Sequence, residues 1–129
     1  LEYDGVPVRV RPDVINHVGG FITDVKTCQD ASPKGFRSAI YQHNYHLQAA
    51  FYMDMLGIDV FKFVACEVNH PHCVVVHTLD EELIELGREE YKKSLEDWKH
   101  YLVTGEARLY EPETRISTYA EDGTFLIKK

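Results

Sequence analysis

Two carboxylates and a lysine near the start of the chain have the residue types and spacing of a metal-dependent hydrolytic site. Asp24 and Lys26 stand two residues apart in the alternating segment 21–27, so both side chains leave one face of a predicted strand. Asp13 lies in Arg-Pro-Asp near the end of the segment 6–15, which also alternates, and a hairpin through the turn between these segments would bring Asp13 next to Asp24. Spacing alone is equally compatible with a surface hairpin that is stabilised by a salt bridge.

The chemistry follows from how such a group of charges is neutralised. Two carboxylates on one face repel each other, and a bound divalent cation removes that cost. Hard oxygen ligands with open coordination positions suit Mg²⁺ or Mn²⁺. A lysine beside the ion can orient a water molecule or stabilise charge that builds up on a phosphate. The pattern therefore predicts hydrolysis of a phosphodiester.

A predicted helix over 33–56 supplies the next polar residues. Ser32 suits its N-cap and Gly57 its C-terminal cap. Gln48 and Tyr52 are four residues apart and share one face of this helix. A polar edge on a helix that otherwise packs against a sheet is typical of a helix face that lies over a functional site on one of the strands. A boundary face with a half-buried tyrosine is the alternative.

The remaining pattern indicates two further strands, over 60–68 and 73–79, and a second long helix that ends near Thr104. Thr78 and Glu81 match a capping box at the start of that helix. A weak edge strand is predicted over 124–127. Apolar residues at helical spacing predict the core face of the two helices: Ile40, Leu47, Phe51 and Met55 in the first, and Ile84, Tyr91, Leu95, Trp98 and Leu102 in the second. We expect one α/β domain over 1–129, with a mixed sheet flanked by helices.

Composition limits the possible classes of protein. The 129 residues suit one domain, and the net charge of −7 counts against a simple DNA-coating protein. No run of about 18 apolar residues is present, so no membrane span is expected. The three cysteines cannot all pair internally, and three free thiols in a reducing cytoplasm is the simplest interpretation.

Other residues offer competing sites. Cys66, His70, His72 and Cys73 have the side chains of a zinc site, but their spacing favours a hairpin turn with incidental histidines. Cys28 has the side chain of a nucleophile, but no sequence feature pairs it with a histidine, so we interpret it as a structural thiol.

The segments Arg-Pro-Asp, Ile-Thr-Asp-Val-Lys-Thr and Tyr-His-Leu-Gln-Ala-Ala-Phe-Tyr together resemble the PD-(D/E)XK nucleases, and most of all the RecE (exodeoxyribonuclease VIII)-like phage exonucleases. The resemblance implies a restriction-endonuclease-like core. It implies that Asp13, Asp24 and the main-chain carbonyl of Val25 ligate the metal ion and that Lys26 is the catalytic lysine. Gln48 and Tyr52 would hold Lys26 or the scissile phosphate in place.

The same resemblance implies an activity and partners. Relatives of this kind degrade linear double-stranded DNA from the 5′ end and supply recombination by strand annealing, so DNA, a single-strand annealing protein and a ring of identical subunits are expected partners. Lys34 and Arg37, at the start of the predicted helix, are candidates for contacts with DNA phosphates. The alternative, which we slightly prefer, is ordinary charge on a helix surface.

The chain departs from the family pattern at one point. Family members carry a metal-binding histidine on a helix before the first strand of the core, and this sequence begins almost at that strand. We therefore expect a nuclease core that lacks the N-terminal helix. The alternative is a catalytically weak or inactive fragment of the nuclease fold that serves as a DNA-binding or assembly module.

Overall fold

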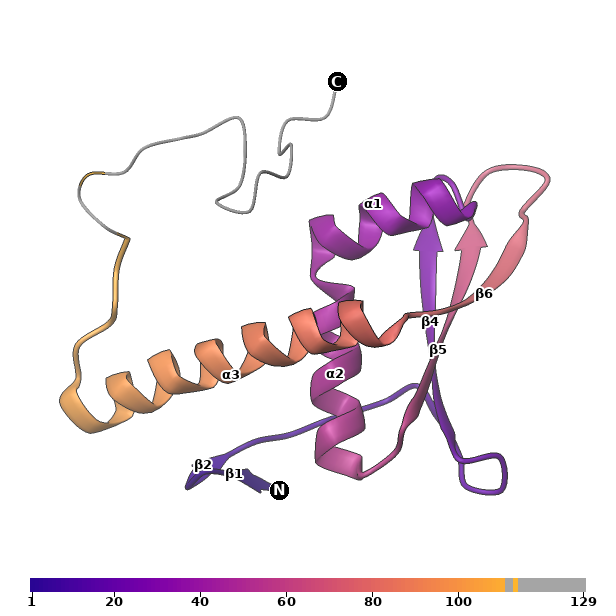
Figure 1. Ribbon diagram of the computed structural model, residues 1–129. Helices are drawn as coiled ribbons and strands as arrows, with labels where there is room; N and C mark the ends of the chain where they lie inside the picture. Colours follow the sequence, from indigo (N-terminus) through magenta and orange to yellow (C-terminus); the bar gives the residue numbers. More distant parts are fainter. Residues whose placement is uncertain (111–112, 114–129) are drawn as a thin grey trace.

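The computed structural model describes residues 1–110 and 113, and these form a mixed sheet with helices packed on one of its faces (Figure 1). The elements in chain order are β1 (Glu2–Tyr3), β2 (Val6–Pro7), β3 (Val14–Asn16), β4 (Phe21–Cys28), α1 (Pro33–His43), α2 (Tyr45–Leu56), β5 (Val60–Glu67), β6 (Val74–Thr78) and α3 (Glu81–Thr104). The α/β class and the mixed sheet predicted from the sequence are confirmed.

The main sheet has the strand order β3-β4-β5-β6. The predicted hairpin is confirmed, since β3 and β4 pair antiparallel with Val14 opposite Thr23. β4 and β5 are parallel, and α1 and α2 form the crossover that a parallel pair requires. β6 returns antiparallel to β5. The two long central strands, β4 and β5, thus carry the helices on one face.

The first predicted strand is wrong over most of its length. Within 6–15, only Val6–Pro7 and the start of β3 are strands, and β2 pairs with β1 in a small separate hairpin. Pro7 and Pro12 have no N–H to donate to a ladder, which explains why the alternating pattern does not form a continuous strand. Asp13 therefore lies just before β3 instead of at the end of a long strand.

The helix predicted over 33–56 is broken at Asn44. Asn44 adopts a left-handed conformation with φ of 56°, and its N–H closes α1 by donating to the carbonyl of Ile40. Asparagine tolerates this conformation better than most residues, so the chain turns here and restarts as α2. The predicted ends are confirmed, because the Ser32 side chain caps α1 and Gly57 caps α2.

The start and the outer half of α3 differ from the prediction. Asp80, not Thr78, is the N-cap, and its carboxylate accepts the N–H of Leu83 at 2.9 Å. Thr78 is still paired with β5 and cannot cap a helix. Trp98 and Leu102 are 50% and 52% exposed, because the C-terminal half of α3 extends past α2 (Figure 1). These two residues are not part of the core, whereas Ile84 and Tyr91 are buried as predicted.

The core lies between the helices and one face of β4 and β5. Its fully buried residues come from alternate positions of the strands and from the inner faces of the helices, and include Ile22, Phe61, Phe63, Ala65, Phe36, Ile40, Ala49 and Ala50. Within residues 1–110 and 113, no helix is long and apolar enough to cross a membrane. The predicted strand over 124–127 lies outside the described residues.

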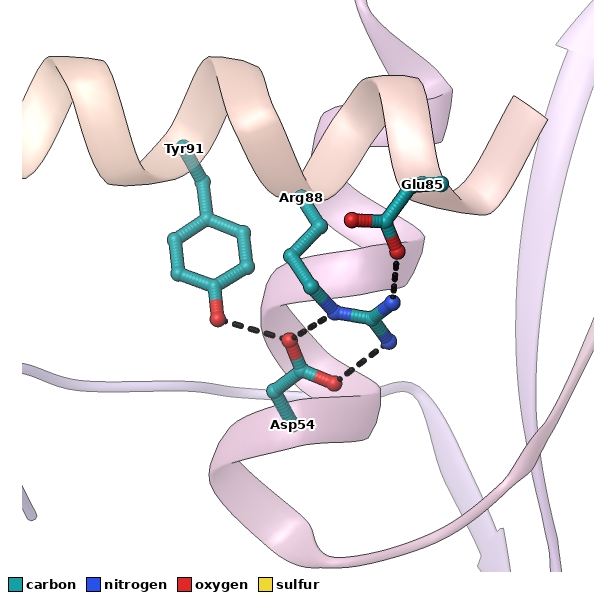
Figure 2. A network of polar contacts seen from close by, with 4 residues as sticks. All are labelled: Asp54, Glu85, Arg88 and Tyr91. Carbon is teal, nitrogen blue, oxygen red and sulfur yellow. Dashed lines mark hydrogen bonds and ion pairs between the residues drawn. The ribbon is translucent and has the colours of Figure 1, made fainter. Parts of the chain in front are cut away.

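A polar network joins α2 to α3 (Figure 2). Asp54 accepts two hydrogen bonds from Arg88, at 2.8 Å and 2.9 Å, and a third from the Tyr91 hydroxyl at 2.6 Å. Glu85 forms an ion pair with the same guanidinium. The network fixes α2 against α3, and α2 is the helix that carries Gln48.

Candidate active site

Asp24 and Lys26 form an ion pair on the inner face of β4. The Lys26 Nζ lies 2.8 Å from the Asp24 Oδ2. Asp24 is only 4% exposed, and the Lys26 side chain is 18% exposed. Their spacing of two residues in an extended strand turns both toward the helices, as the sequence predicted.

Gln48 on α2 connects both members of this ion pair. The Lys26 Nζ donates to the Gln48 Oε1 at 2.8 Å, and the Gln48 Nε2 donates to the Asp24 Oδ1 at a longer 3.4 Å. The two ends of one amide thus meet one donor and one acceptor, which fixes the lysine ammonium in position. Gln48 reaches β4 because α2 packs over the sheet.

Tyr45 completes the surroundings of Lys26, and the sequence analysis assigned it no role. The Lys26 Nζ lies 4.4 Å from the centre of the Tyr45 ring, within the range of a cation–π interaction. The ring also packs against Phe63 in the core. Tyr45 precedes Gln48 by three residues, so the shared helix face was a signal that could have identified it.

Asp13 approaches the same strand from the side of β3. Its Oδ2 accepts the N–H of Val25 at 2.9 Å. The N–H and C=O of one extended residue point to the same side, so the Val25 carbonyl is directed to the edge at which Asp13 lies. Within residues 1–110 and 113, β3 pairs only with Phe21–Thr23, and no other described strand pairs with this part of the β4 edge.

The electrostatics of Asp24 suit a cation. Burial raises the pKa of Asp24 above its ordinary value. Lys26 opposes that rise through its hydrogen bond and its charge, while Asp13 adds to it. The carboxylate is thus buried beside a second carboxylate with its charge incompletely compensated, which is a cost that a bound divalent cation would relieve.

The donor set also fits Mg²⁺ or Mn²⁺. Two carboxylates and one main-chain carbonyl are hard oxygen ligands, and such ions keep several positions for water and phosphate. Among the described residues, no group of three or more His, Cys, Asp or Glu side chains is arranged to hold a metal ion. That finding covers the candidate zinc residues of the β5–β6 turn, where Cys66 and Cys73 are free. Burial raises the pKa of the Cys28 thiol, which disfavours the thiolate that a nucleophile requires.

Three predicted site residues do not join this cluster. Tyr52 lies one turn beyond Gln48, but its ring packs edge-on against Phe61 in the core. Arg37 lines a different cavity, beside His77 and Asp80. In the described part of the chain, neither Arg37 nor Lys34 contacts the Asp24–Lys26 ion pair. The contacts of these two residues with DNA stay a prediction.

A comparison with known protein families identifies one family. The model of a family described as a PDDEXK-like domain of unknown function (DUF3799) matches residues 1–109, which include every strand and helix described above. No curated protein matches the chain. The mixed sheet and its helical cover are consistent with a PDDEXK-like fold. The chain therefore belongs to the PDDEXK-like domain family.

Proposed function

We propose that the protein is a deoxyribonuclease that hydrolyses phosphodiesters with Mg²⁺ or Mn²⁺. The observation that carries the proposal is the cluster on β4, in which Lys26 lies 2.8 Å from both Asp24 and Gln48. A lysine held between a buried acid and a helix-borne amide contributes little to the core. It is instead positioned to act on a reacting group.

Each residue has a role in the proposed mechanism. Asp13, Asp24 and the Val25 carbonyl would hold the ion. When bound, the ion would polarise the phosphate and lower the pKa of a water molecule. The Lys26 ammonium would orient the attacking water and stabilise negative charge on the phosphate during in-line displacement. Gln48 would keep Lys26 in place, and Tyr45 would cover it from the core side.

The finer proposal follows the resemblance to RecE-like exonucleases. In that proposal the substrate is linear double-stranded DNA that is degraded from the 5′ end in the cytoplasm, for phage-type recombination with an annealing protein. A ring of identical subunits and contacts from Lys34 and Arg37 belong to the same proposal. The net charge of −7 means that any basic surface for DNA must be local.

The direct test is cleavage of linear duplex, closed circular and single-stranded DNA, each with Mg²⁺, Mn²⁺ or chelator. We expect metal-dependent loss of the linear duplex. Lys26→Ala should lower the cleavage rate by about 10²–10³-fold or more, because a preorganised donor is removed from the site.

The matched control is Lys62→Ala. Lys62 is on the neighbouring strand β5, and its Nζ lies 4.0 Å from the centre of the Phe21 ring, away from the cluster. We expect this variant to cleave like the wild type. Equal cleavage by Lys26→Ala and the wild type would contradict the proposal. DNA binding without cleavage in any metal would favour the alternative, a catalytically inactive binding or assembly module.

A further inference from the structure

A cavity of about 330 Å³ lies beside the candidate site, between α1 and the end of β4. One wall is a single face of α1, formed by residues at the spacing i, i+3, i+4, i+7 and i+8: Gly35, Ser38, Ala39, Gln42 and His43. These side chains are small or neutral and polar, apart from the imidazole of His43. The volume is at the lower end of the range for small-molecule sites in proteins.

The charges around the cavity disfavour a phosphate as its occupant. None of the described residues that line the cavity is Lys or Arg. Among the described lining residues, Asp30 is the one acid, and its carboxylate accepts the N–H of Ser32 at 2.9 Å. A negative charge therefore lies at the cavity wall. A neutral group with hydrogen-bonding edges fits this lining better than an anion.

An aromatic stack connects the cavity to the candidate site. The His43 and Tyr45 rings stack with centres 5.3 Å apart and planes 26° apart, and both line the cavity. Tyr45 is also the ring beneath the Lys26 Nζ. His43 is exposed, and within the described residues Tyr45 is the ring against which it stacks. The Tyr45 and His43 rings thus form a continuous stack that extends from Lys26 to the cavity.

We propose that this cavity binds an unpaired nucleobase of the DNA strand held at the Lys26 site, stacked on the His43–Tyr45 pair. Bases stack on aromatic side chains without strong sequence preference. A base must leave the duplex to enter a concave site. The Ser38 hydroxyl and the Gln42 amide supply hydrogen-bonding groups in the wall. The assignment of the strand to Lys26 rests on the proposed function, but nucleobase binding itself does not require cleavage.

The test uses a single-stranded oligonucleotide that contains one 2-aminopurine, titrated with protein in chelator so that nothing is cleaved. Stacking quenches the fluorescence of this base. We expect quenching by the wild type, roughly 5- to 150-fold weaker binding and loss of quenching in His43→Ala, and recovery in His43→Phe. Ser38→Trp should block the cavity and also abolish quenching. Circular dichroism verifies that each variant is folded.

The matched control is His17→Ala, which removes an exposed histidine in the turn before β4, and it should quench like the wild type. No quenching by the wild type, or equal quenching by His43→Ala, would overturn the inference. Binding of free 2-aminopurine deoxynucleotide without quenching of the oligonucleotide would overturn the assignment to a DNA strand. Quenching without cleavage contradicts only the proposed function, and cleavage with unaltered quenching in His43→Ala contradicts only this inference.

Discussion

Asp24 and Asp54 are both partly or fully buried aspartates that face a cation, yet their surroundings shift their pKa values in opposite directions. Burial raises the pKa of Asp24, and its single lysine and one long amide contact do not offset that rise. Burial also acts on Asp54, but hydrogen bonds from Arg88 and Tyr91 outweigh it and lower the pKa below its ordinary value. The same side chain is thus incompletely compensated in one place and fully compensated in the other.

The difference separates a site from a structural contact. Asp54 accepts three short hydrogen bonds and has little left to offer a ligand (Figure 2). Its partner Tyr91 is affected as well, since burial and the hydrogen bond to Asp54 raise the pKa of the Tyr91 hydroxyl. Asp24 keeps lone pairs and uncompensated charge beside Asp13. Residues arranged for function commonly carry such a cost in stability.

We expect the largest difference between the two aspartates in DNA cleavage, measured after each carboxylate is replaced by a neutral amide. Asp24→Asn should lower metal-dependent cleavage by at least roughly 10³-fold, because it removes charge from the proposed ion site. Asp54→Asn, assayed well below its unfolding temperature, should stay within a few-fold of the wild type. Similar losses in the two variants would mean that Asp24 acts only through the fold.

The second comparison measures stability. Asp54→Ala should lower the free energy of unfolding by about 1.5–3 kcal/mol, because it removes two hydrogen bonds of Arg88 and leaves the buried Tyr91 hydroxyl without its partner. Denaturant unfolding followed by circular dichroism measures this change. The matched control is Asp97→Ala, which removes an exposed ion pair with Arg108 and should cost less than about 0.5 kcal/mol. Equal losses would show that the Asp54 network is no stronger than a surface pair.

The smallest expected effect is in the pH dependence of stability. The lowered pKa of Asp54 means that its contribution is present above the ordinary aspartate pKa of 3.8 and is lost as the pH falls through the lower folded value. Asp54→Asn should therefore flatten the acid limb of the stability curve.

Asp24 should behave in the opposite way. Its raised pKa means that ionisation costs stability at neutral pH, so Asp24→Asn should unfold at a slightly higher temperature at pH 7. The gain should disappear below pH 3.8, where the carboxyl is protonated in both states. Thermal melts of both variants between pH 3 and 8 measure the effect, and a gain for Asp24→Asn that persists at the acid end would contradict the proposed electrostatics.

Local pattern was sufficient for much of the fold and for the centre of the site. Alternation in β4 predicted that Asp24 and Lys26 share a face, and the four-residue spacing on α2 predicted the helix face of Gln48. Those predictions rest on strand and helix periods that hold wherever the element lies. The pattern was insufficient where neighbouring elements decide burial: Trp98 has core spacing on its helix, yet it is 50% exposed. The role expected of Tyr52 at the site stays a prediction.

The sequence by itself determined the residue types of the site, the α/β class, the hairpin and the caps at Ser32 and Gly57, because each depends on residues close together in the chain. Only the tertiary structure decided which groups from distant parts of the chain contact each other. Asp54 and Arg88 are 34 residues apart, and Lys26 and Gln48 are 22 apart, so their contacts depend on how the α1–α2 crossover places α2 against β4 and α3. The opposite pKa shifts of two aspartates follow from that placement, since burial and hydrogen bonding are properties of the folded surroundings.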